Sequence, residues 1–448
     1  MVIKISNKNH HLLKIIFLLF ILSFCSINSR AQSSTITLWK DGVIGAIWND
    51  STKTVAYGRK DINGYYKIYL SDSSGNNEQQ LTYAGWDPNR HQWAEEWHPS
   101  GQYLFCYVEK TDYAPETGHT RVPDDAIPGY GAYTDIWLVK RDGSQAWQLT
   151  NLPNNYDNGV IHGAISKDGS LFAWSQRISA PNIFDMNLAA GAYVMKVANF
   201  IGGATPTLSN IRTFQPGGIA AANELESISN DKTTLAFYSS YESKSILTTP
   251  IYTINMITGK IFPLTTESFA QTPTYNPSGT KIVYMTGKDC NIFPFEVQGA
   301  DWWQMNTNGS NKLRITRMNV TNDPQSVNHY RLAGSISFIS DSIFLGGVMT
   351  KPFGLTGYTV KVKILSTIGE DQNPDFFIFP NPTDGMLTIQ LYNIKDKEKI
   401  QIHNALGELI KEMEVSEITV MDIADFPNGI YFLNLKRIPK VSAKFIKQ

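Results

Sequence analysis

Short apolar stretches and tight turns alternate along the middle of this chain, and they recur as repeats. One recurring phrase is a turn followed by an apolar stretch, as in NDSTKTVAYG from residue 49, HPSGQYLFCYV from 98 and SKDGSLFAWS from 166. Asx-Gly and Ser-Gly turns between short β-rich runs predict hairpins, because Gly tolerates positive φ. Steps of 50, 68, 63, 47 and 63 residues separate the turn residues of the six copies, which are Asp50, Ser100, Asp168, Asp231, Ser278 and Asp341.

A second phrase follows the first and consists of a strand, a turn and a short strand that ends in Leu-Thr or a similar pair. Examples are DIWLVKRDGSQAWQLT from residue 135 and DWWQMNTNGSNKLRIT from 301. Four short strands in each repeat of roughly 50 to 65 residues predict the blades of a β-propeller. The six copies predict six blades over residues 34–366. Because the last copy lacks a strand, we expect Ser34–Lys40 to pair with Thr359–Leu365 and close the ring.

The pattern changes after Ile364. Residues 367–374 form a polar connection with Gly and Pro, which predicts a linker. Residues 375–448 contain short alternating stretches, among them MLTIQL, KIQIHN, ITVMDI and GIYFLNLK, with turn residues between them. This pattern predicts a small antiparallel β-sandwich. The predicted fold class is therefore all-β, a six-bladed β-propeller followed by a small Ig-like β-sandwich.

The first residues have the pattern of an export signal. Lysines precede the apolar run Ile15–Ile27, which is shorter than a membrane-spanning helix needs. Small residues then favour cleavage after Ala31, so residues 1–31 are expected to be a signal peptide. A lipoprotein signal ending at Cys25 is less favoured, because Phe24 is not small. No transmembrane segment is expected after cleavage, and a net charge of -1 argues against a nucleic-acid partner.

The repeat phrases resemble those of TolB-like (WD40-like) β-propellers, in which a W-S-P-D-G turn precedes an apolar strand and a strand-turn-strand phrase ends in Leu-Thr. DWWQMNTNGSNKLRIT and AISKDGSLFAWS are close to this pattern, whereas NDKTTLAFYS and ISDSIFLGG lack the Gly. The resemblance covers about residues 35–366. It implies the fold and leaves the function open, since one fold carries many functions.

The last seventy or so residues resemble, in order and spacing, the type A C-terminal sorting domain of the type IX (Por) secretion system of Bacteroidota. Four stretches carry the resemblance: FPNPTDGMLTI, IQIHNALGELI, IADFPNGIYFLNL and KFIKQ. It implies that the type IX translocon and a cell-surface sortase are partners, and that the protein is secreted or attached to the outer-membrane surface. The positions that match the sorting motifs are Pro380, Asn381, Pro382, Gly385, Gly407, Pro427, Asn428 and Gly429. An ordinary Ig-like binding module is the alternative.

Candidate binding residues come from the long connections, which the blade geometry places on one face of the ring. His162 and Glu226 are expected to begin inner strands there and to share one funnel with Glu95 or Glu96. Converging carboxylates repel each other unless a cation or a basic partner is present, and Mn²⁺ or Ca²⁺ would suit them. Solvated loop charges are the alternative. The polar candidates are Asp87, Arg90, His91, Glu95, Glu96, His119, Arg121, Asp124, Asp125, His162, Glu224, Glu226, Asp301, Asp323, His329 and Arg331.

The aromatic candidates could stack on sugar rings or pack between blades, and they are Trp86, Trp93, Tyr113, Tyr130, Trp302 and Trp303. The sequence contains no nucleophile elbow, zinc-protease motif or phosphate-binding loop. We therefore expect a secreted or surface-attached propeller that binds an extracellular glycan or protein. The alternatives are a metal-assisted polysaccharide lyase or hydrolase on the long-loop face and a scaffold for surface assembly.

Overall fold

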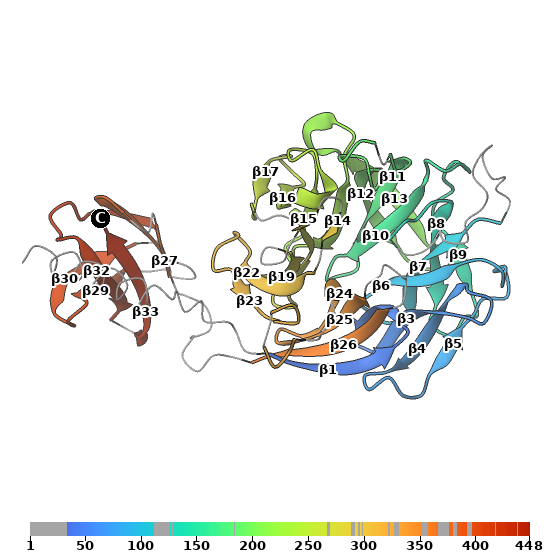
Figure 1. Cartoon of the computed structure of the whole chain (residues 1–448), viewed down its shortest axis with the longest axis horizontal. Coiled ribbons are helices and arrows are strands. Elements are labelled where there is room, and N and C mark those ends of the chain that lie inside the picture. The colour runs from blue at the N-terminus through green and yellow to red at the C-terminus, as the bar shows by residue number, and fades with distance from the viewer. Residues whose placement is uncertain are drawn as a thin grey trace, which may run out of the picture. The chain divides into compact units, whose positions relative to one another are not determined.

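The structure of the protein is a computed structural model, and the chain forms two compact units, residues 1–365 and 366–448 (Figure 1). The predicted signal peptide and the predicted linker at 367–374 lie outside the described residues. The structure describes residues 34–111, 126, 129–182, 184–266, 269–287, 292–293, 296–297, 299–320, 323–326, 331–350, 357–365, 376–379, 383–391, 397–416, 418–436 and 438–448.

The described part of the first unit contains six four-stranded antiparallel sheets. The strands of the first three, from the innermost outwards, are β2 (Ile44–Asn49), β3 (Thr54–Lys60), β4 (Tyr66–Asp72) and β5 (Gln79–Leu81); β6 (Gln92–Trp97), β7 (Tyr103–Glu109), β8 (Thr134–Lys140) and β9 (Ala146–Gln148); and β10 (Gly159–Ile165), β11 (Leu171–Ser179), β12 (Ala192–Ile201) and β13 (Thr207–Phe214).

The other three sheets follow the same order, except that the last takes its outer strand from the start of the chain. Their strands are β14 (Asn223–Ile228), β15 (Thr234–Ser239), β16 (Ile251–Asn255) and β17 (Ile261–Pro263); β18 (Ala270–Tyr275), β19 (Lys281–Thr286), β22 (Asp301–Asn306) and β23 (Leu313–Arg314); and β24 (Arg331–Ser340), β25 (Ile343–Thr350), β26 (Gly357–Ile364) and β1 (Ser34–Asp41). Short elements in the connections are β20 (Ile292–Phe293), β21 (Glu296–Val297) and the 3₁₀ turns η1 (Pro216–Gly218) and η2 (Ile246–Thr248).

The six sheets close into a ring. Each inner strand contacts the next, in the order β2, β6, β10, β14, β18 and β24, and β24 contacts β2 again. The inner strands face a common centre, and the sheets spread outwards from it (Figure 1). Apolar side chains fill the space between neighbouring sheets, as where Phe105 of β7 stacks on Phe172 of β11 at 4.1 Å between ring centroids. The all-β propeller is thereby confirmed, and six sheets agree with the six predicted blades.

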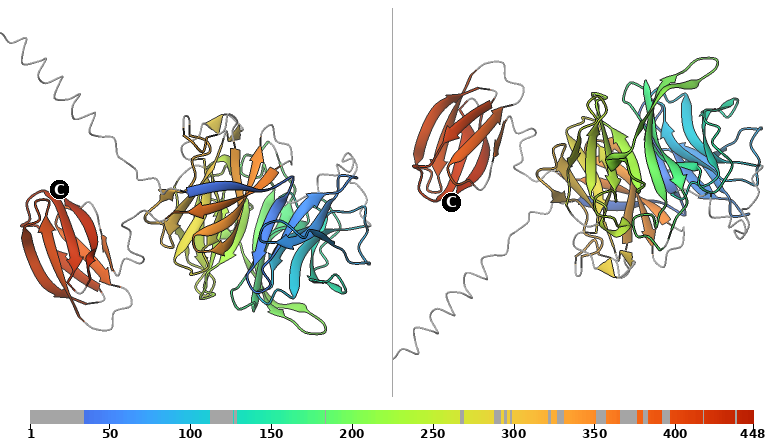
Figure 2. Two further views of the ribbon diagram at one scale, coloured as in Figure 1. Left: turned by 90° about the horizontal axis from the view of Figure 1, so that it is seen from below. Right: turned by 90° about the horizontal axis from the view of Figure 1, so that it is seen from above.

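The ring closes through the start of the described chain, as the sequence predicted. β1 pairs antiparallel with β26 from Ser34 opposite Ile364 to Asp41 opposite Tyr358. Figure 2 shows β1, in blue, beside the orange strands of the last sheet. The Ser34 hydroxyl also donates to the Ile315 carbonyl at 2.7 Å, which ties the strand to the preceding blade.

The Leu-Thr ending of the second repeat phrase has a structural cause. In the second blade the Thr150 hydroxyl accepts from the Ile136 amide at 2.9 Å and donates to the Asp135 carboxylate at 2.8 Å. In the fifth blade Thr316 does the same with the Trp302 amide, at 3.0 Å, and the Asp301 carboxylate, at 2.8 Å. The threonine thus clips the outer strand to its neighbour where the ladder ends, and satisfies buried groups that would otherwise be costly.

The described residues of the second unit form two sheets around one apolar core, which agrees with the predicted small β-sandwich. The first sheet has the order β27, β28, β31 and the second the order β30, β29, β32, β33. The strands are β27 (Phe376–Phe379), β28 (Met386–Leu391), β29 (Glu398–Asn404), β30 (Leu409–Val415), β31 (Ile418–Asp422), β32 (Gly429–Leu435) and β33 (Ile438–Lys447).

The motif residues of this unit occupy turns. Gly407 lies between β29 and β30 at φ +84°, a conformation that favours glycine. Pro427 and Asn428 lead into β32, which begins at Gly429, and the Tyr431 hydroxyl donates to the Pro427 carbonyl at 2.7 Å. The Gly385 carbonyl accepts from the Ile423 amide at 2.7 Å. The other predicted motif residues, Pro380, Asn381 and Pro382, lie outside the described residues.

Candidate functional site

Each of the six inner strands carries a β-bulge at the same place. The register against the second strand shifts between Ile44 and Ile47, Ala94 and Glu96, Ile161 and Gly163, Leu225 and Ser227, Gln271 and Thr274, and Ala333 and Ile336. A bulge inserts one extra residue and re-aims its side chain. The first residues of the six bulges are Gly45, Glu95, His162, Glu226, Thr272 and Gly334.

The bulges make the channel asymmetric. Three successive blades place Glu95, His162 and Glu226 at the bulge, whereas the other three place Gly or Thr there. These three charged residues and Glu96 line one cavity of about 250 Å³ at the centre of the ring. The side of the cavity formed by the sixth and first blades is apolar, and its members include Val43, Ile47, Ile336, Val348, Met349 and Tyr358.

His162 lies between two carboxylates. Its Nε2 is 3.0 Å from Glu224 Oε2, and its Nδ1 is 3.4 Å from Glu226 Oε1. Burial by itself would lower the pKa of His162, but Glu226, Glu224 and Glu95 outweigh it and raise the pKa to about 10. The imidazole is therefore a cation at neutral pH. It is the basic partner that the sequence argument required for converging carboxylates.

The acids of the cavity differ in how well they are hydrogen-bonded. Glu224 accepts from the Tyr238 hydroxyl, Glu95 accepts from the Gly163 amide at 2.5 Å, and Glu96 accepts from the Trp97 amide at 3.0 Å. Burial raises the pKa of Glu96 to about 8, with a contribution from the charge of Glu95. Burial also raises the pKa of Glu226 to about 7, although His162 opposes the rise.

The structure thus brings together Glu95, Glu96, His162 and Glu226, and it corrects one detail. His162 and Glu226 do not begin their strands, because each is the fourth residue of its strand. They reach the cavity through the bulge rather than through a position at the mouth of the channel. Sequence reasoning did not find the bulges, because the repeat phrases that it compared begin after them. It also missed Tyr107 and Tyr238, which pack behind the acids from second strands.

His91 and Arg90 are not part of this cavity lining. His91 is fully buried, and its Nδ1 accepts from the Tyr66 amide at 3.0 Å. Arg90 donates to the carbonyls of Lys110 and Thr111, at 3.0 and 2.9 Å. Both side chains hold backbone in place between the first two blades. His329 lies outside the described residues, and so does the side chain of Arg331 at the start of β24.

Trp302 and Trp303 pack inside the fold rather than forming a platform for sugars. Trp302 is fully buried, and its Nε1 donates to the Gly334 carbonyl at 3.2 Å. The Arg314 guanidinium lies 5.9 Å from the ring centroid of Trp303. Flat aromatic faces recognise sugars only when they are exposed, so the packing explanation holds for Trp302.

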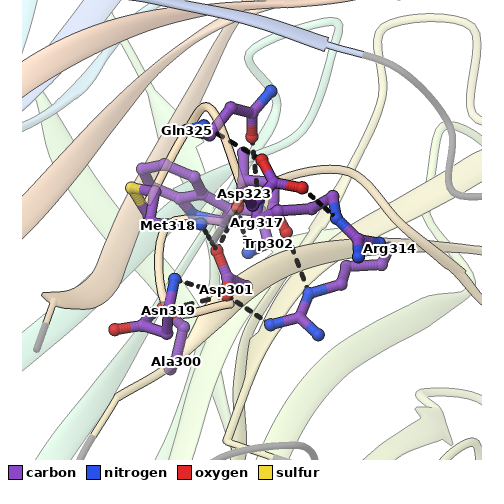
Figure 3. A network of polar contacts seen from close by, with 10 residues as sticks. Ala300, Asp301, Trp302, Arg314, Arg317, Met318, Asn319, Asp323 and Gln325 are labelled. Carbon is purple, nitrogen blue, oxygen red and sulfur yellow. Dashed lines mark hydrogen bonds and ion pairs between the residues drawn. The ribbon is translucent and has the colours of Figure 1, made fainter. Parts of the chain in front are cut away.

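Asp301 and Asp323 also have structural partners, which Figure 3 shows. Asp301 accepts from the Met318 amide at 2.8 Å and pairs with Arg314 at 2.6 Å between Oδ2 and Nη2. Asp323 pairs with Arg317 at 2.6 Å. Among the described residues, no group of three or more His, Cys, Asp or Glu side chains is arranged to hold a metal ion.

The fold and the cavity define a β-propeller with a polar channel, followed by a separate β-sandwich unit. Residues 377–448 match the family described as the secretion system C-terminal sorting domain. The chain therefore carries a type IX sorting domain, and the protein is secreted or attached to the cell surface. Across the described residues no helix has the length and apolar character to cross a membrane.

Solved structures resemble the chain distantly. TolB of Acinetobacter baumannii is 14% identical with a TM-score of 0.43, and the match covers 72% of this chain and 65% of that one. A TolB-like protein of Agrobacterium tumefaciens is 13% identical with a TM-score of 0.41, covering 63% and 88%. An oligogalacturonate lyase in complex with manganese is 10% identical with a TM-score of 0.40, covering 75% and 92%. No curated protein matches the sequence.

Proposed function

We propose that this secreted propeller binds an extracellular ligand in its central cavity, and that the ligand is a protein or peptide rather than a glycan chain. The observation that carries the proposal is the set of three successive bulges that turn Glu95, His162 and Glu226 into one cavity. Burying several acids together costs stability. A fold that needed only a filled channel would place apolar side chains there, so a polar channel supports a binding role.

The size of the cavity supports the choice of ligand. A volume of about 250 Å³ lies below the ~300–1,000 Å³ of pockets that enclose drug-sized molecules. It has room for one side chain or chain end and not for several sugar rings. His91 and Trp302 were predicted to contact a glycan, but both side chains are buried and cannot reach one.

The described residues do not favour the metal-assisted polysaccharide enzyme. Such an enzyme needs a base, a cation and a basic group for the substrate carboxylate. His162 already pairs with two carboxylates, and Arg90 is engaged by backbone carbonyls away from the cavity. We therefore propose binding and no reaction.

The test is a comparison of peptide and glycan arrays probed with the full chain. Glu226→Gln removes a cavity charge while keeping the shape of the side chain. Asp142→Asn is the matched control, because it makes the same exchange of carboxylate for amide at an exposed turn. We expect wild-type and Asp142→Asn protein to share peptide ligands that Glu226→Gln protein loses. Array binding that is the same for all three proteins, or that is confined to glycans, would refute the proposal.

A further inference from the structure

The wall of the cavity has more acids than bases. Glu95, Glu96 and Glu226 line it directly, and Glu224 lies behind His162. His162 is the one basic side chain among the described residues that line the cavity. One imidazolium can balance only one of these four carboxyl groups once they ionise, so their full ionisation calls for a further positive charge.

Two buried polar atoms at this wall lack a hydrogen-bond partner within the described structure. One is Glu226 Oε1, which is near His162 Nδ1 at 3.4 Å but outside hydrogen-bond geometry. The other is the hydroxyl of Tyr107, whose side chain is fully buried. That hydroxyl would lie 2.9 Å from a Cβ built on Gly163, so it lies behind the cavity wall that Gly163 and Glu95 form. Buried polar groups are rarely left unpaired, and a ligand in the cavity would supply the missing partner of Glu226, which lines it.

The opposite wall is apolar and offers no charge. Ile47 comes from the first blade, and Ile336, Val348 and Met349 come from the sixth. A ligand that fills the cavity therefore meets acids on one side and hydrocarbon on the other.

We propose that the cavity recognises a primary ammonium group on a short apolar stem, with the ammonium against the three acids that line the cavity, Glu95, Glu96 and Glu226, and the stem against the sixth blade. This inference rests on the proposed function, because it takes the cavity to be the binding site. An ammonium carries three donors and fits the unpaired acceptors around it. A sugar hydroxyl carries no positive charge and would not favour the ionised forms of these acids. A calcium ion would require about six to eight oxygen ligands.

The ionisation of the acids agrees with this assignment. In the ligand-free protein burial holds the pKa of Glu226 at about 7 and that of Glu96 at about 8, so both are partly protonated near neutral pH. A cation placed beside them favours their ionised forms. The groups that face Glu226 are His162, Glu224, Glu95, Tyr107 and Tyr238. Binding of an ammonium is therefore accompanied by proton release.

The test uses three probes of equal length on the full chain: n-hexylamine, hexan-1-ol and hexanoate. Their affinities are measured by calorimetry for wild-type, Glu226→Gln, Glu96→Gln and Asp142→Asn proteins. We expect the amine to bind, and the alcohol and the acid to bind about thirtyfold or more weakly, the loss that accompanies an unpaired buried charge. Glu226→Gln should weaken the amine to a similar degree, whereas Asp142→Asn should not. Glu96→Gln leaves the His162 contacts intact and should also weaken binding of the amine. It therefore tests the inference even if Glu226→Gln misfolds.

The dependence on pH gives a second readout. The affinity for hexylamine should rise between about pH 6 and about pH 8.5, because the acids ionise while the amine, with an ordinary pKa near 10.4, stays charged. Calorimetry in buffers of different ionisation enthalpy should show proton release. Equal affinity for amine and alcohol, or affinity that falls as pH rises, would overturn the inference.

Peptides then distinguish the sources of the ammonium group. Binding of a lysine-containing peptide that is lost on acetylation of lysine identifies a side chain, and loss on acetylation of the α-amine identifies a chain end. If hexylamine binds but neither peptide does, the ligand is a small amine. That result supports the ammonium inference and refutes the protein or peptide ligand of the proposed function. If peptides from the array need Glu226 for binding but bind equally well after acetylation, the proposed function is supported and the inference that the cavity recognises an ammonium group is refuted.

Discussion

At the scale of single residues, His162 shows how a channel tolerates buried acids. Its two ring nitrogens face Glu224 and Glu226, and it occupies a bulge at φ +48°, a conformation that residues other than glycine adopt rarely. This strained backbone conformation places the His162 imidazolium between the two carboxylates, whose attraction offsets the strain. A second buried pair, Asp301 with Arg314 within the fifth blade, has both carboxylate oxygens of Asp301 hydrogen-bonded. The two clusters therefore differ in role. The His162 cluster leaves Glu226 Oε1 without a hydrogen bond, whereas the Asp301 cluster satisfies its carboxylate.

The cavity should make the protein less stable at alkaline pH. The pKa values of His162, Glu96 and Glu226 are all raised, to about 10, 8 and 7, from ordinary values of 6.5, 4.5 and 4.5. The folded state thus binds these protons more tightly than the unfolded state does. The stability that they contribute is complete below the ordinary values and is lost as pH rises through the raised ones. We expect calorimetry to give a lower Tm at pH 9 than at pH 5.

The matched variant for this prediction is Glu96→Gln, which cannot ionise. Its Tm should fall less between pH 5 and pH 9 than that of the wild type. An equal fall in both proteins would show that Glu96 does not carry the dependence.

The Asp301–Arg314 pair should contribute to stability through the cost of breaking it. Arg314→Met leaves the Asp301 carboxylate, which is fully buried, without its cation. We expect a loss of about 3–5 kcal/mol in the free energy of unfolding, measured with urea. Lys53→Met is the control, since it removes the exposed partner of Asp50 and should cost about 0–1 kcal/mol. Similar losses for the two variants would contradict this account.

At the scale of elements, the inner strands line the channel, whereas β1 closes the ring. The bulges in β6, β10 and β14 aim polar residues at the channel, and the apolar residues of the same strands pack between blades. β1 supplies the outer strand that β24 to β26 lack. A sheet without it would expose the edge of β26, which is a long row of unpaired backbone groups.

Removing Gln32–Lys40 should therefore destabilise the whole ring. We expect a Tm lower by roughly 10 °C or more, because a ladder of hydrogen bonds worth ~1 kcal/mol each is lost. A synthetic peptide with the sequence of Ser34–Asp41 should restore part of the loss by pairing with the free edge. A melting curve that the deletion leaves unchanged would show that β1 does not hold the ring.

At the scale of the whole molecule, the two units carry separate tasks. The propeller has its own closed ring and its own cores, and the sorting unit has one core of its own, which includes Leu387, Ile402 and Leu433. The family match is confined to residues 377–448, so the sorting signal lies outside the propeller.

Deleting residues 375–448 should abolish export to the cell surface and leave a folded propeller in the periplasm. The ring is complete at β26 and does not need the later residues. Fractionation and immunoblotting, with circular dichroism of the retained protein, measure both outcomes. Glu226→Gln in the full chain is the control and should reach the surface at the wild-type level. Normal surface levels of the truncated protein would refute the role of the tail.

The sequence by itself determined the architecture. Six turn-and-strand phrases with a strand missing from the last predicted both the ring and its closure by Ser34–Lys40, because hairpin turns and apolar alternation are local signals. The order and spacing of the FPNPTDG, NALGELI and FPNGIYF stretches predicted the sorting unit, because motif residues such as Gly407 meet local needs of turns.

Only the tertiary structure decided which polar residues share a site. Glu95, His162 and Glu226 lie 67 and 64 residues apart and meet because three bulges occupy equivalent places in the ring. His91 and Trp302 looked equally eligible in sequence, yet both are buried by packing between blades. Burial and orientation depend on contacts between distant strands, and a one-residue bulge changes the face on which a side chain lies. The local sequence pattern therefore does not predict which of these residues line the cavity.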